Sequence, residues 1–178
     1  MDLTELGNHN YGVYIAEGAQ RNIIGGADAG TRNVISNNGI EGVIIRDSGT
    51  DHNVVAGNYI GMDISGTQSL GNDTEGVLIC LGAQFNRVGG STSDERNIIG
   101  GNVYRGVGLW SGAMSNTVQG NYIGLDVSGA SPVGNGASGV LVSDGAQYNQ
   151  IGGTAPGERN IISGNGVEGV VLWDSGTM

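Results

Sequence analysis

The fold is decided by an eleven-residue block that occurs twice in the chain. It reads NVVAGNYIGMD at Asn53–Asp63 and NTVQGNYIGLD at Asn116–Asp126. A compact globular domain has no need to repeat such a block, whereas a chain that winds through equivalent turns does. The repeat therefore predicts a solenoid whose turns can be followed along the sequence.

Gly-Val pairs mark the equivalent points of successive turns. Their glycines are Gly12, Gly42, Gly76, Gly106, Gly139 and Gly169. The steps of 30, 34, 30, 33 and 30 residues alternate, so the repeating unit is a pair of coils, first 64 and then 63 residues long. We predict one domain over 1–178, with coils 12–41, 42–75, 76–105, 106–138 and 139–168 between the partial coils 1–11 and 169–178.

Each coil contains three short apolar runs separated by Gly/Asn corners. In the first coil type these are GVYI, NIIGG and NVISN, with a loop at Ala27–Arg32, and in the second they are GVII, NVVAG and YIGMD, with a loop at Ile64–Glu75. Runs of four to six residues rich in Val and Ile favour strands over helices. Three strands per coil are too few for four-stranded propeller blades, so we predict an all-β, parallel β-helix in which strands pair between coils about 4.8 Å apart.

Two blocks carry a resemblance to a known family. They are GNYIGMD…LGN at Gly57–Asn72 and ERNIISGN at Glu158–Asn165. The chain resembles the right-handed parallel β-helix repeats of the pectin-lyase-like superfold, in the form found in large secreted or surface bacterial repeat proteins. The resemblance implies a secreted or cell-surface location. It does not imply one activity, because the fold carries lyases, hydrolases, adhesins and inert stalks.

The repeated positions have a structural interpretation. The second and fourth residues of each Gly-Val run share a face and are assigned to the core: Val13/Ile15, Val43/Ile45, Val77/Ile79, Val107/Leu109, Val140/Val142 and Val170/Leu172. Recurrent asparagines are predicted to stack as amide ladders: Asn22/Asn86/Asn149, Asn33/Asn97/Asn160, Asn38/Asn102/Asn165 and Asn58/Asn121. The recurrent Arg32, Arg96 and Arg159 are expected to hold acidic neighbours or backbone carbonyls.

Composition and charge exclude several classes of partner. The net charge of −10, with seven Arg and no Lys, argues against nucleic acid. No apolar run is long enough to span a bilayer, and the first residues do not form a signal peptide. The single cysteine, Cys80, excludes an internal disulfide framework and is interpreted as a semi-buried strand residue.

Catalysis requires carboxylates that converge, and the sequence offers few. Asp63 and Asp126 are equivalent residues two coils apart, which places them about 9.6 Å from one another. That distance is longer than the separation of the two catalytic carboxyl groups in retaining glycosidases, and it barely falls within the range for inverting glycosidases. We expect no cofactor, with a calcium ion at Asp63 and Asp126 as a weak alternative, because no calcium-loop spacing is present.

The outward positions of the Gly-Val strands form an unusually apolar line. They include Tyr14, Arg46, Trp110 and Trp173. An exposed apolar strip marks either an interaction surface or an area covered by loops. We therefore predict that these four residues bind carbohydrate or a partner protein.

The leading functional prediction is a non-enzymatic, extracellular structural or adhesive β-helix segment. It would bind polysaccharide through its apolar, Trp-bearing face, or associate with itself laterally or end to end. Because neither end supplies a polar capping unit, we expect either a fragment of a longer array or ends that stack into filaments or swapped dimers. The alternative is a polysaccharide lyase or glycoside hydrolase with acidic loop residues. A third hypothesis, an ice-binding solenoid, is disfavoured because the outward positions form no regular threonine lattice.

Overall fold

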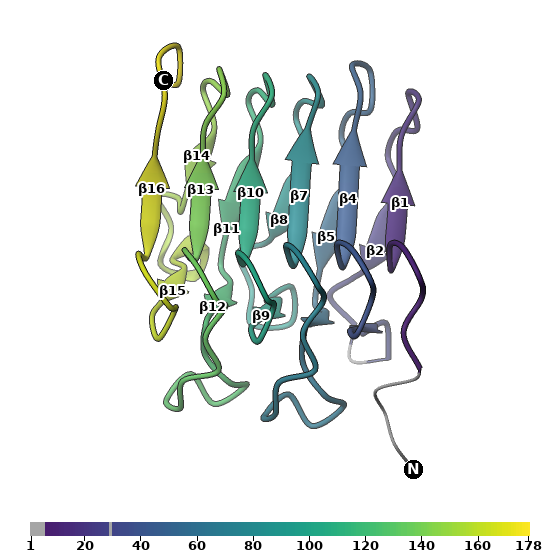
Figure 1. Cartoon of the computed structure of the whole chain (residues 1–178), viewed down its shortest axis with the longest axis vertical. Helices are drawn as coiled ribbons and strands as arrows, with labels where there is room; N and C mark the ends of the chain where they lie inside the picture. Colours follow the sequence, from purple (N-terminus) through teal and green to yellow (C-terminus); the bar gives the residue numbers. More distant parts are fainter. Residues whose placement is uncertain (1–5, 29) are drawn as a thin grey trace.

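A computed structural model describes residues 6–28 and 30–178 of the chain. The predicted partial coil 1–11 and the predicted loop 27–32 therefore lie partly outside the described residues. The described part is an all-β solenoid of about five coils, with three parallel sheets that run along its length (Figure 1). The predicted β-helix with three strands per coil is confirmed. Its handedness and its pectin-lyase-like type stay predictions.

Each sheet takes one strand from each coil, in chain order. Sheet A contains β1 (Val13–Ile15), β4 (Val43–Arg46), β7 (Val77–Cys80), β10 (Val107–Leu109), β13 (Val140–Val142) and β16 (Val170–Leu172). Sheet B contains β2 (Ile23–Gly25), β5 (Val54–Ala56), β8 (Arg87–Gly89), β11 (Thr117–Gln119) and β14 (Gln150–Ile151). Sheet C contains β3 (Val34–Ile35), β6 (Tyr59–Ile60), β9 (Ile98–Ile99), β12 (Tyr122–Ile123) and β15 (Ile161–Ile162). A short 3-10 turn, η2, covers Pro156–Glu158.

The strand register follows the sequence repeat residue by residue. In sheet A the valine of each Gly-Val pair lies opposite the valine of the next coil, as Val43 lies opposite Val77. Inward-facing side chains of all three sheets fill one apolar column, and Ile45, Ile79 and Leu109 in it are fully buried. The predicted core residues Val170 and Leu172 are exceptions, 41 % and 68 % exposed, because β16 has a neighbour on one side only among the described strands.

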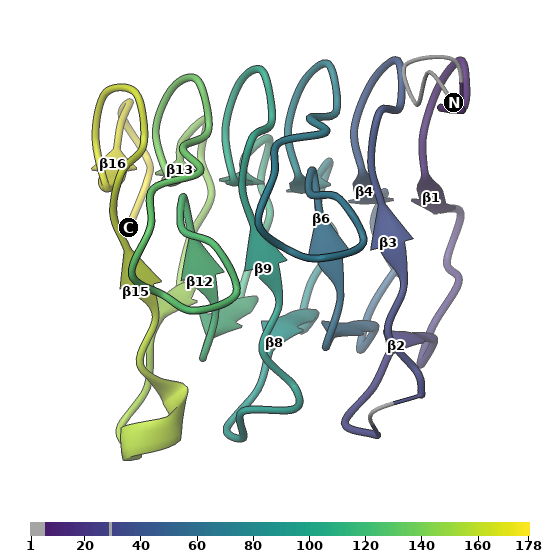
Figure 2. The same cartoon turned by 90° about the horizontal axis from the view of Figure 1, so that it is seen from below.

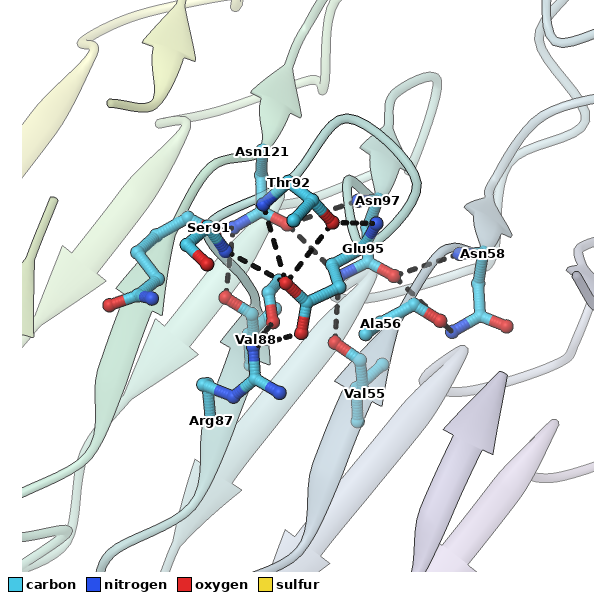
Figure 3. Close-up of polar contacts among 12 residues, drawn as sticks. Val55, Ala56, Asn58, Arg87, Val88, Ser91, Thr92, Glu95, Asn97 and Asn121 are labelled. Atoms are coloured by element: carbon cyan, nitrogen blue, oxygen red, sulfur yellow. Dashed lines mark hydrogen bonds and ion pairs between the residues drawn. The ribbon is translucent and has the colours of Figure 1, made fainter. Parts of the chain in front are cut away.

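Three asparagine ladders run along the corners between the sheets. Their members are Asn22-Asn53-Asn86-Asn116-Asn149, Asn33-Asn58-Asn97-Asn121-Asn160 and Asn8-Asn38-Asn72-Asn102-Asn135-Asn165. In the second ladder the side-chain amide of Asn58 donates to Asn97, and that of Asn97 donates to Asn121 (Figure 3). Ladders were predicted, but with one member every second coil. Both coil types contribute, so Asn58 and Asn121 belong to the same ladder as Asn97.

In the second coil type the long loop follows the third strand, β6 or β12, as predicted. Each folds back on itself through an antiparallel bridge, Met62 to Ser69 and Leu125 to Pro132. The two loops project from the same side of the solenoid (Figure 2), and the amide of Val127 donates to the carbonyl of Gly66. This bond links loops that lie two coils apart, so the pair of coils is a structural unit as well as a sequence unit.

Candidate functional surface on sheet A

The outer face of sheet A carries the residues predicted to bind a partner. Strand register places Arg46, Trp110 and Trp173 in one row across the sheet, because Arg46 pairs with Cys80 and the two tryptophans directly follow β10 and β16. Tyr14 lies one row away and pairs with Ile44. Tyr14 and Trp173 are exposed, whereas Arg46 and Trp110 are half-buried. The four residues share a face but do not form one contiguous cluster.

The apolar line between these residues is not open to solvent. Ile44, Leu78 and Cys80 are buried and form a cluster, against which Tyr11 and Trp110 pack. We call these five residues the outer strip. The burial of Ile44, Leu78 and Cys80 corrects the prediction of an exposed apolar surface in the middle of this face, because these three side chains pack against one another and against Tyr11 and Trp110. Exposed apolar area on this face is concentrated at its two ends, near Tyr14 and near Trp173.

Charged groups that the sequence analysis did not single out lie beside the outer strip. Glu41 and Glu75 precede the Gly-Val pairs of adjacent coils and are only 7 % and 3 % exposed. The guanidinium of Arg105, in the next coil, donates to Glu75 Oε1 over 2.8 Å. Arg105 also lies over the rings of Tyr104 and Trp110, 4.5 and 5.4 Å from their centres. Two buried carboxylates and one arginine therefore occupy successive coils. The signal was present in the sequence, at the residue before each Gly-Val pair.

Burial raises two pKa values on this face, those of Glu41 and Cys80. Burial is the main cause that raises the pKa of the Glu41 carboxyl, and its own backbone amide opposes it. The negative charge of Glu75 adds to the rise, whereas Thr74 and Arg46 act against it. Burial also raises the pKa of the Cys80 thiol to about 11. Cys80 is therefore an inert thiol at neutral pH, as its interpretation as a strand residue implied.

Asp63 and Asp126, the predicted calcium ligands, each organise their own loop. Asp63 accepts hydrogen bonds from the hydroxyl of Ser65 and the amides of Thr67 and Gln68, and Asp126 accepts equivalent bonds from its loop. The pKa of Asp63 lies below its ordinary value, because these bonds outweigh the opposing effect of burial. For Asp126 the Ser128 hydroxyl is the main cause of the lower pKa. In residues 6–28 and 30–178 no three acidic, histidine or cysteine side chains gather into a metal site.

The recurrent arginines have structural partners. Arg32 lies 4.3 Å from the ring centre of Tyr59 and donates to the carbonyl of Gly57. Arg96 repeats this arrangement with Tyr122 and Gly120. The prediction that these arginines hold carbonyls is confirmed for both. Glu95, adjacent to Arg96, instead pairs with Arg87.

Glu95 closes the loop between β8 and β9. Its carboxylate accepts from Arg87 Nη1 at 2.9 Å, from the amide of Ser91 at 3.0 Å and from the hydroxyl of Thr92 (Figure 3). Burial acts to raise the pKa of Glu95, but these donors outweigh it and the pKa lies below the ordinary value of 4.5. The ionised form is therefore the one that the folded loop stabilises.

We expect Glu95→Gln to destabilise the protein at neutral pH and to match the wild type in acid. A carboxyl whose pKa is lowered by folding contributes stability above its unfolded pKa and loses it as the pH falls through its folded pKa. Urea unfolding at pH 7 and at successive values below 4.5 measures the difference. Asp94→Asn, next to it in the same loop, is the control. A Glu95→Gln effect that persists unchanged in acid would contradict this account.

Comparisons with protein families, with curated proteins and with solved structures each found no match. Within the described part of the chain, no helix has the length and apolar character needed to cross a membrane. The functional argument therefore depends on the structure of the chain and not on relatives.

Proposed function

We propose that the chain is a non-enzymatic, extracellular structural segment that acts as a rigid scaffold. The observation that supports this proposal is that the residues repeated from coil to coil have structural roles. The recurrent asparagines form three ladders and the recurrent aliphatic residues fill one column. Two of the three recurrent arginines, Arg32 and Arg96, lie over tyrosine rings. A repeated residue that has a structural partner in each coil does not mark a unique active site. The residues that are not repeated then carry recognition.

Trp173 supports an adhesive role at one end of sheet A. It is 67 % exposed, beside β16, which has a neighbouring strand on one side only among the described strands. An exposed indole ring offers a flat apolar face that stacks on sugar rings or on a partner protein. Trp110 is half-buried against Arg105 and contributes less free area. We assign polysaccharide binding to the Trp173 end, with self-association as the competing role.

We expect Trp173→Ala to weaken polysaccharide binding by at least tenfold, which corresponds to about 1.4 kcal/mol. The protein is incubated with a panel of uronate and neutral polysaccharides, with and without calcium, and binding and product release are both measured. Tyr148→Ala is the matched control, since Tyr148 is 66 % exposed but lies at a corner outside sheet A. Equal losses in the two variants would contradict a specific site at Trp173.

The same assay separates the scaffold from the alternative enzyme. A lyase or hydrolase would release product, and loss of that release in Asp126→Ala would replace our proposal with catalysis on the loops. Light scattering at several concentrations tests self-association. A strict monomer that binds polysaccharide supports adhesion, whereas oligomers that dissociate in Trp173→Ala assign this end to contact between copies.

A further inference from the structure

The third asparagine ladder contains three Asn-Gly steps. They are Asn38-Gly39, Asn135-Gly136 and Asn165-Gly166. An asparagine followed by glycine loses its side-chain amide as ammonia more readily than other asparagines, because glycine has no Cβ to hinder attack by its nitrogen. All three glycines are exposed, so water reaches each step from outside. Whether a step reacts therefore depends on how firmly its asparagine is held.

The reaction is a spontaneous deamidation that consumes only water. The glycine nitrogen attacks Cγ of the asparagine, the new C–N bond closes a succinimide ring, and the Cγ–Nδ2 bond breaks. Nδ2 leaves as ammonia with the proton that the glycine nitrogen gives up. Water then opens the ring to aspartate or to isoaspartate, in which the main chain runs through the side-chain carbon. The glycine nitrogen and the asparagine amide must therefore both leave their hydrogen bonds before the ring closes.

Asn135 is held by both neighbouring coils and is 1 % exposed. Its Oδ1 accepts from the amide and the side chain of Asn102. Its Nδ2 donates to the carbonyl of Ile99 at 3.2 Å and to Asn165 Oδ1 at 2.8 Å. The nitrogen of Gly136 donates to the carbonyl of Asn102 at 2.9 Å. Ring closure at Asn135 therefore requires that its coil separate from the coils on both sides.

Asn38 is held in the same way and is 3 % exposed. Its Oδ1 accepts from the amide and the side chain of Asn8, and its Nδ2 donates to Asn72 Oδ1 at 2.7 Å. The nitrogen of Gly39 donates to the carbonyl of Asn8 at 2.9 Å. This step is therefore protected by bonds to the coil before it and to the coil after it.

Among the described residues, Asn165 has a ladder partner on one side only. It is half-buried, and its Oδ1 accepts from the amide and the side chain of Asn135. Its Nδ2 donates to backbone carbonyls alone, to Ile123 at 3.1 Å and to Ser163 at 3.4 Å. The nitrogen of Gly166 is bonded as in the other two steps, so the difference lies in the side chain. Water replaces bonds of a partly exposed amide at little net cost, so Asn165 leaves the ladder more often than the two buried members.

We propose that Asn165 is a site of spontaneous deamidation, and that the third ladder protects Asn38 and Asn135 from the same reaction. Modification of Asn165 then removes the protection of Asn135. An ionised aspartate only accepts hydrogen bonds, so its carboxylate repels the carbonyl of Ile123 to which Nδ2 donated. Isoaspartate also reroutes the main chain before Gly166, whose nitrogen donates to the carbonyl of Asn135 at 2.8 Å. Asn135 becomes the outermost firmly held member and reacts next, whatever the protein binds.

The test follows the unaltered chain, folded and unfolded in guanidinium chloride, during incubation at mildly alkaline pH. Trypsin cleaves after arginine and places the four relevant asparagines on the separate peptides 33–46, 97–105, 106–159 and 160–178, in which mass spectrometry measures deamidation. A sample digested at time zero corrects for reaction during the digestion. Asn102 is the matched internal control, because it is as buried as Asn135 and adjacent to it in the ladder but is followed by Val103.

In the folded chain we expect Asn165 to react at least about tenfold faster than Asn38 and Asn135, because opening at a buried position is the rarer event. In the unfolded chain we expect the three Asn-Gly steps to react at similar rates, and Asn102 to react far more slowly in both states. Equal folded rates at Asn165 and Asn135 overturn the proposal. So does a rate difference between these two that persists in the unfolded chain, or a folded rate at Asn165 as slow as that of Asn102.

Fragmentation of the intact chain in the mass spectrometer tests the order of the two events. We expect molecules modified at Asn135 to be modified at Asn165 as well, and Asn165→Asp to raise the folded rate at Asn135 at least about threefold, because a weakened neighbour makes local opening more frequent. Asn160→Asp is the matched control, since Asn160 is the half-buried last described member of the second ladder, in the same coil, and is followed by isoleucine. Molecules modified at Asn135 alone overturn the proposal, as does a rate at Asn135 that is unchanged in Asn165→Asp or equally raised in both variants.

Discussion

Asn97→Ala is expected to lower the free energy of unfolding by about 3 kcal/mol, since several buried polar groups would lose their partners. Asn97 is fully buried in the middle of the second ladder. Its Oδ1 accepts from the amide and the side chain of Asn58, and its Nδ2 donates to the carbonyl of Val55 at 2.8 Å and to Asn121 at 2.9 Å. Alanine cannot replace any of these bonds, and water does not reach the site. Urea unfolding followed by circular dichroism measures the loss.

The control for this prediction is the same substitution at the edge of a ladder. Asn22 is exposed, and its side chain makes one bond, to Asn53. Water replaces that bond in Asn22→Ala, so we expect a loss of less than about 1 kcal/mol. If both variants lose the same stability, the ladders act through corner propensity and not through buried hydrogen bonds.

Gly89→Ala is expected to have the larger effect, a loss of about 4 kcal/mol or failure to fold, because strain and overlap add at one residue. Gly89 ends β8 with a φ of +90°, in the region that favours glycine. A Cβ at this position would overlap the carbonyl oxygen of Gln119 in the next coil and press on the side chain of Asn121. The substitution therefore pushes two coils apart and disturbs a ladder. Soluble yield and thermal unfolding report the outcome.

A second glycine separates these two causes. Gly145 has a φ of +72°, and a Cβ there would meet nothing within 4 Å. Gly145→Ala carries the backbone strain alone, and we expect it to cost about 1–2 kcal/mol. Comparable losses at Gly89 and Gly145 would show that contact between coils contributes little.

The fold was predictable because the same spacing and the same alternation of side chains recur in each coil. Gly-Val spacing gave the register of sheet A, and alternation within each run gave inward residues such as Ile79 and Leu109. Ladder membership was only half predictable. Asn53 and Asn86 belong to unlike coils, so comparing equivalent blocks 63 or 64 residues apart did not bring them together.

The outer face of sheet A was harder to predict. Alternation places Ile44 and Leu78 outward, yet both are buried, because side chains of adjacent coils cover them. The packing of side chains on this face includes contacts between coils, such as that of Glu75 with Arg105, which are 30 residues apart in the sequence. A sequence pattern within one strand does not contain that information. The burial of Glu41 and Glu75 was missed for the same reason, since it arises where adjacent coils pack on one another.

The asparagine ladders also give the solenoid a polarity. In each ladder the side-chain amide of one coil donates to the oxygen of the next coil toward the C-terminus, as Asn33 donates to Asn58 and Asn58 to Asn97. The amide dipoles are therefore aligned, and aligned hydrogen bonds strengthen one another. Two coils stacked in the opposite sense would place oxygen against oxygen or amide donor against amide donor. Any coil that extends this lattice, from the same chain or another, must therefore stack head to tail.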